Sequence, residues 1–208
     1  MCDVLLTVEQ PSIIKELGYT AAEAQLLSVP PYAVAFVLTL TVAILSERTR
    51  RRAPFIMGSS ALACIGYILL LSDPRPGVSY VGTIFAAAGI YPAVAIVLSW
   101  PANNVSGQTK RCIANAMQIS IGNCGAVLGT QLYRTETAPR YFLGHGFALG
   151  YLVANIVVVF ILWQVLNREN AEKARIRDRE GLPALMGDVG DAEGDFQGDK
   201  DPRWIFQT

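Results

Sequence analysis

The chain has 208 residues, of which 52% are hydrophobic, and its 17 basic and 17 acidic residues give a net charge of zero. Long apolar runs free of Asp, Glu, Lys and Arg are separated by short charged segments. This pattern excludes a water-soluble globular domain, because apolar runs of membrane-spanning length are costly to expose to water. The basic residues form small clusters beside the apolar runs, which argues against nucleic-acid binding.

The first 25 residues hold one short apolar stretch, Val4–Ile14, which is interrupted by Glu9 and Pro11. A transmembrane helix needs about 20 mainly apolar residues, so this stretch is too short to span a bilayer. It lacks the basic start of a signal peptide. We therefore predict that residues 1–25 form a truncated helix stub and an outer loop.

Residues 26–166 contain five uncharged apolar runs, each long enough to span a bilayer as a helix. The runs are Leu26–Leu45, Pro54–Leu71, Val78–Ala102, Ile113–Leu132 and Phe142–Leu166. They predict an all-α membrane protein whose five full transmembrane helices form a bundle.

The residues after the last apolar run differ sharply in composition from the bundle. Residues 167–181 are rich in charge and predict a helix that leaves the membrane on the cytoplasmic side. Residues 182–208 are rich in Gly and Asp and predict a disordered acidic tail.

The basic residues are divided unequally between the two ends of the predicted bundle. Eleven of them lie in segments 46–52, 103–112 and 167–181, and four lie at the opposite end. Cytoplasmic segments of membrane proteins carry the excess of Lys and Arg. We therefore expect the C-terminus in the cytoplasm and, after five crossings, residues 1–25 outside. One further helix on the N-terminal side would restore six crossings.

Amide side chains in the run Ile113–Leu132 mark a candidate functional site, because lipid offers polar groups no partner. Asn115, Gln118 and glycines at 122, 125 and 129 recur every three or four residues, and Asn123 joins this helix face. The amides either hydrogen-bond across a helix interface or line a polar pathway that binds substrate. Both interpretations are open from the sequence alone.

The run Val78–Ala102 adds a phenol and an indole. Tyr91 precedes Pro92, which bends a helix in mid-span, and we predict that its hydroxyl projects into a cavity. Trp100 lies near the cytoplasmic end of the run, where the interfacial aromatic belt of membrane proteins explains it.

Small residues at helical spacing predict packing faces in three other places. They are Ser59, Ala63 and Gly66, then Gly82, Ala86 and Gly89, and finally Gly146 and Gly150. Two polar residues of the last run have structural explanations. We predict an interhelical hydrogen bond for Asn155 and a solvated interfacial position for His145.

Groups that would support catalysis are absent from the sequence. The runs hold no carboxylate pair, and neither G-x-S-x-G nor H-E-x-x-H occurs. The four cysteines show no CxxC spacing and the chain has one histidine, so we expect no metal site and no cofactor. Amides, hydroxyls and a phenol bind solutes, so we do not expect an enzyme.

Four segments carry a resemblance to a known family. They are LSVPPYAVAFVLTLTVAILSERTRRRAPFI, AAAGIYPAVAIVLSWPANNVSGQTKR, ANAMQISIGNCGAVLGTQLYRTETAPRYFLGHG and DKDPRWIF. Together they resemble the C-terminal half of a major facilitator superfamily transporter over roughly residues 10–208. The likeness is greatest to the fungal allantoate permease family of organic anion:cation symporters.

The resemblance implies two six-helix bundles around a central substrate site, of which this chain supplies an incomplete C-terminal bundle. It places the third span, with Tyr91, on the cavity, and the first and fourth spans on the gating walls. We take four residues as pathway or substrate contacts, namely Tyr91, Asn115, Gln118 and Asn123. The resemblance matches three further residues to a loop that latches adjacent helices at the cytoplasmic side by charge pairing, namely Glu47, Arg48 and Arg52.

The expected function is proton-coupled symport of a small organic anion across the plasma membrane. The expected partners are the lipid bilayer, the anion with its proton, and a missing N-terminal six-helix half. The alternative is a truncated membrane fragment that does not transport and has a structural or interaction role.

Overall fold

The computed structural model describes residues 26–72, 76–132, 142–182 and 198–208. The predicted stub and outer loop at residues 1–25 lie outside these ranges. The described elements are α3 (Val29–Thr49), α4 (Ala53–Ser72), α5 (Pro76–Asn104), α6 (Gln108–Leu132), α7 (Phe142–Glu180) and the short 3-10 helix η2 (Gly198–Lys200).

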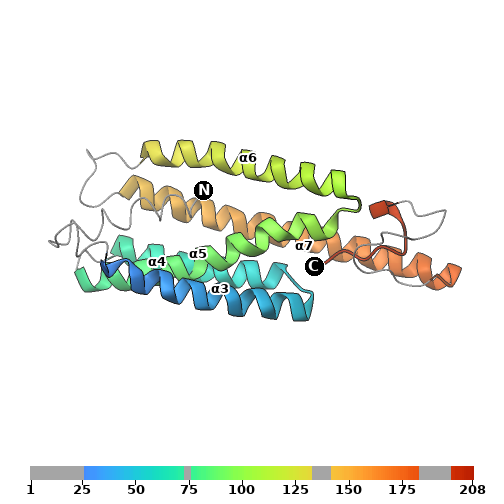
Figure 1. Ribbon diagram of the computed structural model, residues 1–208, viewed down its shortest axis with the longest axis horizontal. Helices are drawn as coiled ribbons and strands as arrows, with labels where there is room; N and C mark the ends of the chain where they lie inside the picture. The colour runs from blue at the N-terminus through green and yellow to red at the C-terminus, as the bar shows by residue number, and fades with distance from the viewer. Residues whose placement is uncertain (1–25, 73–75, 133–141, 183–197) are drawn as a thin grey trace.

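Consecutive helices run in opposite directions along one long axis (Figure 1). The three basic segments 46–52, 103–112 and 167–181 therefore gather at one end of the molecule, at the right of Figure 1. We call it the Arg-rich end. Gly107, with φ of 91°, lies in the turn between α5 and α6 at this end, because only glycine adopts that conformation without strain.

Four of the described helices, α3, α4, α5 and α7, are long and apolar enough to cross a bilayer. The prediction of an all-α membrane protein is thus confirmed, whereas the count of five spans is not. Helix α6 forms, but it begins at Gln108 instead of Ile113 and includes Lys110 and Arg111 in its first turn. Its amides make Ile113–Leu132 the least apolar of the membrane-length runs that we predicted, and the two charges make the whole helix α6 more polar still.

The outward faces of the helices are apolar. Ile121 is 69% exposed, Phe36 65% and Val158 61%. Water would solvate such a continuous apolar surface at a high cost in free energy, whereas the acyl chains of a bilayer match it. The chain is therefore an integral membrane protein.

Helices α4 and α5 cross with their main chains in contact. A Cβ atom added at Gly66 would lie 2.8 Å from the carbonyl oxygen of Gly82, and one added at Gly89 would lie 2.8 Å from Cα of Ala63. Ala63 and Ala86 are fully buried beside these glycines. The packing faces predicted on these two runs are confirmed, and we call this contact the α4–α5 seam.

The third predicted packing face is wrong. Gly146 and Gly150 of α7 are exposed, and a Cβ atom added at either would meet no described atom within 4 Å. Small residues at helical spacing are necessary for a close crossing, but a facing helix must also approach them. Helix α7 instead turns Ala148 and Leu152 toward the bundle, and both are buried.

Helix α7 continues without a break from the apolar run through the charged residues, and ends at Gly181, which has φ of 66°. The boundary that we predicted between residues 166 and 167 is therefore a change of composition within one helix. Ala, Arg, Glu and Lys are good helix formers, so charge does not interrupt the helix.

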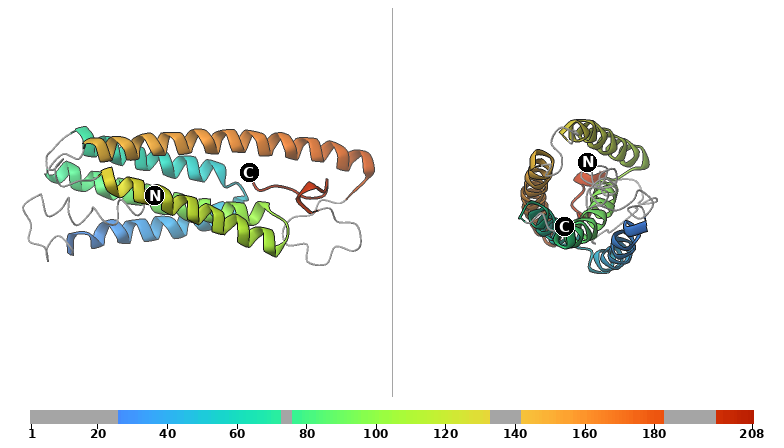
Figure 2. Two further views of the ribbon diagram at one scale, coloured as in Figure 1. Left: turned by 90° about the horizontal axis from the view of Figure 1, so that it is seen from above. Right: turned by 90° about the vertical axis from the view of Figure 1, so that its left-hand side faces the viewer.

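The prediction of a disordered tail is wrong for residues 198–208. This segment folds back against the Arg-rich end (Figure 2), where Trp204 is 1% exposed and Asp201 is 3% exposed. The overall composition of residues 182–208 concealed a short apolar motif, Trp204–Phe206, in which Trp204 is buried and the next two residues are partly buried. Residues 183–197 lie outside the described ranges.

Candidate solute-binding cleft and Arg52 network

A cleft of about 720 Å³ lies among α5, α6 and α7, with Ser60 of α4 at its floor. This volume falls within the range of about 300–1,000 Å³ that is typical of small-molecule sites. Its lining is Ser60, Ile90, Ala93, Val94, Val97, Leu98, Gln118, Ile119, Ile121, Gly122, Asn123, Gly125, Tyr151, Leu152 and Asn155. Most of these side chains are apolar, and the polar ones among them are uncharged.

The cleft exists because α6 packs loosely. Helix α5 packs closely on α3 and α4, but α6 makes fewer contacts with α5 and still fewer with α7. In Figure 1 and in the right-hand view of Figure 2, α6 lies at the edge of the bundle and on the side away from α3. The amide-bearing face of α6 therefore leaves an open space between α6 and α5. At the α4–α5 seam, small residues let the two helices approach so closely that no such space remains.

Gln118 links α6 to α5 at a defect in the α5 helix. Its amide Nε2 donates a hydrogen bond of 3.0 Å to the carbonyl oxygen of Val97. In a regular helix this carbonyl would accept from the residue four positions later, but that residue is Pro101, which has no N–H. The Gln118 amide therefore replaces a missing main-chain donor, and its Oε1 atom is buried without a partner among the described residues.

The other amides of α6 differ in their surroundings. Asn123 lines the cleft and is exposed. Asn115 lies one helical turn from Gln118, and its Oδ1 atom is buried without a partner in the described part of the chain, but Asn115 is not among the lining residues. Asn155 of α7, for which we predicted an interhelical bond, faces the cleft opposite α6.

Tyr91 is not part of this cleft. Its ring packs edge-on against Tyr32 of α3, with 5.9 Å between the ring centroids. The structure therefore brings Gln118 and Asn123 together and leaves Tyr91 on the side of α5 that faces α3. The sequence could not give this result, because Pro92 fixes a bend but not the direction in which Tyr91 points.

Two other predictions about single side chains are wrong. Trp100 is 5% exposed, so it is packed inside the protein, and its indole Nε1 donates to the carbonyl oxygen of Gln207 at 2.8 Å. His145 is also 5% exposed, and its ring centroid lies 6.0 Å from that of Tyr67 on α4. Burial against α4 replaces the solvated position that we expected for it.

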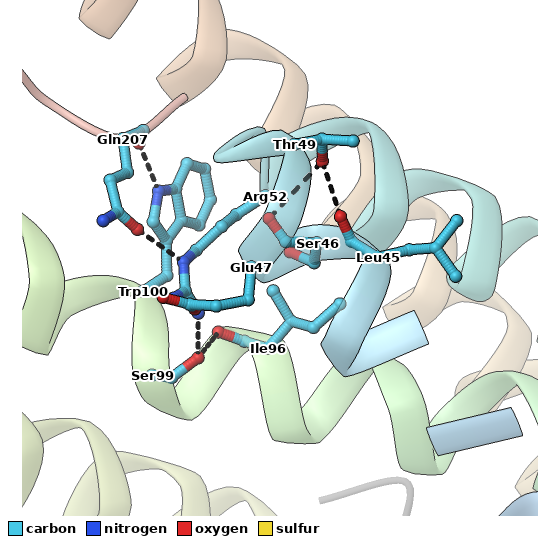
Figure 3. Close-up of polar contacts among 9 residues, drawn as sticks. All are labelled: Leu45, Ser46, Glu47, Thr49, Arg52, Ile96, Ser99, Trp100 and Gln207. Carbon is cyan, nitrogen blue, oxygen red and sulfur yellow. Dashed lines mark hydrogen bonds and ion pairs between the residues drawn. The ribbon is translucent and has the colours of Figure 1, made fainter. Parts of the chain in front are cut away.

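Arg52 is the centre of a polar network at the Arg-rich end (Figure 3). It lies just before α4, and its side chain is 6% exposed. One terminal nitrogen pairs with Oε2 of Glu47 at 2.7 Å, the other donates to Ser99 of α5, and Nε donates to Oε1 of Gln207 at 2.7 Å.

This network contains two of the three predicted latch residues. Burial lowers the pKa of Arg52, whereas the charge of Glu47 and the hydrogen bond to it act in the opposite direction. Glu47 is 71% exposed, so one end of the ion pair remains open to solvent. Arg48 lies on the exposed last turn of α3 and does not enter the network.

The cleft supplies hydrogen-bond groups in an apolar wall, and its lining residues carry no charge. Among the described residues there is no group of three His, Cys, Asp or Glu side chains that would hold a metal ion. Such a site is suited to bind and orient a polar solute. Sequence reasoning missed Ser60 and Tyr151 as lining residues, because neither differs in sequence from an ordinary span residue.

Curated proteins similar to this chain are transporters. A Schizosaccharomyces pombe protein named as an uncharacterized transporter is 33% identical over 87% of this chain and 36% of its own length. The MFS-type transporter cnsO of Penicillium expansum is 33% identical over 89% of this chain and 38% of its own length. The high-affinity nicotinic acid transporter of Saccharomyces cerevisiae is 31% identical over 84% of this chain and 33% of its own length.

This chain is similar to fungal transporters, one of which, cnsO, is named as MFS-type. It spans about a third of the length of these relatives. Their names describe transporters and not enzymes. No family model matches the chain, and no solved structure matches it.

Proposed function

We propose that this chain is the C-terminal half of a major facilitator transporter of the allantoate permease type. With the rest of that transporter, it would carry small organic anions across the plasma membrane by proton-coupled symport. The observation that carries the proposal is the cleft, in which amides meet an otherwise apolar wall in a chain related to transporters.

Amides suit an organic anion because their N–H groups donate to carboxylate oxygens. Asn123 of α6 and Asn155 of α7 both line the cleft. One N–H of the Gln118 Nε2 group already donates to Val97, so Gln118 would act mainly by holding α6 against α5 and through its second N–H. Asn115 and Tyr91 lie outside the cleft lining, so they would contact solute only on a path that the rest of the transporter completes.

An anion also needs a countercharge or a co-transported proton. The described cleft residues include no cation, so this group would come from the other half of the transporter. Substrate sites of this kind lie between two halves that rock about them. The nicotinic acid transporter of S. cerevisiae is a relative named for a molecule of the proposed class.

In this proposal α6 is the fifth membrane-spanning helix, and the Arg-rich end faces the cytoplasm because of its excess of basic residues. The Glu47–Arg52 pair would act there as the latch between neighbouring helices, and Arg48 would join it in another conformation. The pair links the end of α3 to the start of α4, where a rocking motion would change the spacing.

The test is an uptake assay with a hybrid protein. The chain is joined to the part of the S. cerevisiae nicotinic acid transporter that it does not match, in a cell that lacks this transporter. We expect uptake of labelled nicotinic acid or of another acid in a panel of small organic anions, faster at acidic external pH because a proton accompanies the anion. The chain alone should show no uptake.

Each contrary outcome is informative. Uptake by the chain alone would contradict its role as a half. Absence of uptake by a hybrid that reaches the plasma membrane would contradict transport and would support the alternative of a membrane module with a structural or interaction role.

A further inference from the structure

Residues 198–208, which we call the tail segment, lie along the second half of α7 toward the ends of α5 and α4 (Figure 2). The segment begins with η2, turns at residues 201–203 and ends with residues 204–208, which are not helical. Its residues Asp201 and Trp204 are almost completely buried. The helices contact both the main chain and the side chains of the tail segment.

Two asparagines form hydrogen bonds with the main chain of the tail segment. Asn170 of α7 donates from Nδ2 to the carbonyl oxygen of Phe206 at 2.9 Å and accepts from the N–H of Phe206 at 3.0 Å. Asn104 of α5 donates to the carbonyl oxygen of Gln207 at 3.1 Å and accepts from its N–H at 2.7 Å. Each amide therefore pairs both main-chain groups of one residue, as a neighbouring strand would.

Apolar and cationic groups of the helices bind the aromatic side chain of the tail segment. Phe206 packs against a buried cluster at the Arg-rich end that includes Trp100 and Leu166. The Nζ atom of Lys173 lies 4.0 Å from the centroid of the Phe206 ring, which is a cation–π geometry. The same ammonium donates to the carbonyl oxygen of Asp199 at 2.6 Å.

The tail segment bonds to four helices at once. It reaches the start of α4 through Arg52, whose main-chain N–H donates to Thr208 at 2.6 Å, and the end of α5 through Asn104. It reaches the start of α6 through the pair Lys110–Asp199 at 3.0 Å, and it follows α7. Helices α5 and α7 each pack extensively on α4 but little on each other, so the tail segment is a direct link between their ends.

We infer that the ends of α5 and α7 form a docking site for an extended peptide with an aromatic side chain, occupied here by residues 198–208, and that the docked segment braces the Arg-rich end. Gln207 then holds Arg52 by its side chain and Trp100 by its main chain, so docking and the Glu47–Arg52 pair support each other. In a transporter, and resting on the function proposed above, release of the tail segment would precede opening of this end.

Hydrogen–deuterium exchange on the purified chain in lipid nanodiscs tests the inference without any transport assay. In the wild type, we expect the amides of Phe206 and Gln207 to exchange at least ten-fold more slowly than in a free peptide of residues 198–208. The double variant Asn104→Ala/Asn170→Ala should exchange these amides at the rate of the peptide. Exchange in the last turn of α5 and at residues 166–173 of α7 should rise as well.

The matched control is Asn103→Ala/Asn167→Ala, which removes two neighbouring asparagines that do not bond to the tail segment. It should behave as the wild type, and the α4–α5 seam should stay protected in all three proteins. Exchange of the wild-type tail amides at the peptide rate would overturn docking. Loss of tail protection with unchanged exchange at the ends of α5 and α7 would overturn bracing, whatever the outcome of the uptake assay.

Discussion

Helix α5 has two contrasting neighbours. Toward α4 it presents Gly82, Ala86 and Gly89, and the two main chains touch. Toward α6 it presents larger side chains such as Val97, and a single amide from Gln118 bridges the gap beside an open cleft. One helix therefore forms both the most closely packed and one of the most open contacts of the bundle.

The difference teaches how a membrane bundle separates structural from functional surfaces. Lipid supplies no hydrophobic drive for helix association, so a close contact depends on small residues that let main chains approach. A face with amides cannot pack in this way. It remains a site where a polar solute finds partners, provided that the seam holds the rest of the bundle rigid.

The largest expected effect comes from breaking the seam. Gly89→Leu places a branched side chain where even a Cβ atom would lie within 3 Å of α4 main-chain atoms, so the bundle should not assemble. Gly146→Leu is the matched control, because it adds the same side chain to an exposed site on α7. The measurement is the yield of monodisperse protein in detergent. Equal yields would show that the seam does not exist as described.

The Arg52 network should give the next largest effect. Arg52→Glu places a carboxylate beside Glu47 and removes the donors to Ser99 and Gln207. A hydrogen bond to a charged group contributes about 1.5–3 kcal/mol, so the thermal midpoint in detergent should fall clearly. Arg51→Glu changes the same charge at an exposed neighbour and should have little effect. A similar fall of the thermal midpoint in both variants would show that the loss of stability comes from the change in net charge and not from the Arg52 network.

A double-mutant cycle sharpens the account of the α5–α6 contact. Gln118→Leu should cost about 1 kcal/mol of unfolding free energy, because the carbonyl of Val97 loses its donor. In a Pro101→Ala background, residue 101 regains an N–H that can donate to Val97, so the same substitution should cost less. Equal costs in the two backgrounds would mean that Gln118 does not compensate for the proline.

The smallest expected effect lies in the exposed pair of Lys110 and Asp199. Partial burial raises the pKa of Asp199, but hydrogen bonds from Lys110 and the main chain, with the charges of Lys110 and Lys173, lower it, and the net pKa is below its usual value. The contribution of this pair is thus present above the unfolded pKa of about 3.9 and is lost as pH falls through the lower folded value.

Lys110→Ala should therefore cost at most about 0.2–1 kcal/mol of stability at neutral pH, as is usual for exposed ion pairs. The difference from the wild type in thermal midpoint should shrink as the pH falls below about 3.9 and disappear once the pH lies below the folded pKa of Asp199. A difference that grows as the pH falls would contradict this assignment of charges.

The sequence predicted the elements of the bundle well because uncharged apolar length is a direct physical requirement for a membrane helix. It also predicted the seam, since Gly66 and Gly89 serve a contact whose spacing is visible along the chain. Within the candidate site, the shared face of Gln118 and Asn123 followed from helical periodicity, and both line the cleft.

Other features depend on contacts between residues far apart in the sequence. Tyr91 faces Tyr32 of α3 because of how two helices are rotated, which no local pattern determines. The tail segment docks because Asn104, at the end of α5, and Asn170, in the second half of α7, bond to its adjacent residues, although each resembles an ordinary polar residue in the sequence. Composition alone therefore predicted disorder for a segment that the fold binds.

The most direct test of the central claim, that the amide-lined cleft binds the transported solute, is the KM for uptake by the hybrid transporter. Asn123→Leu removes an amide that lines the cleft, and it should raise KM about ten-fold, since one lost hydrogen bond to a carboxylate costs about 1.5 kcal/mol or more. Gln108→Leu removes an exposed amide at the start of the same helix and should leave KM unchanged. An unchanged KM in both variants, with uptake intact, would contradict the account.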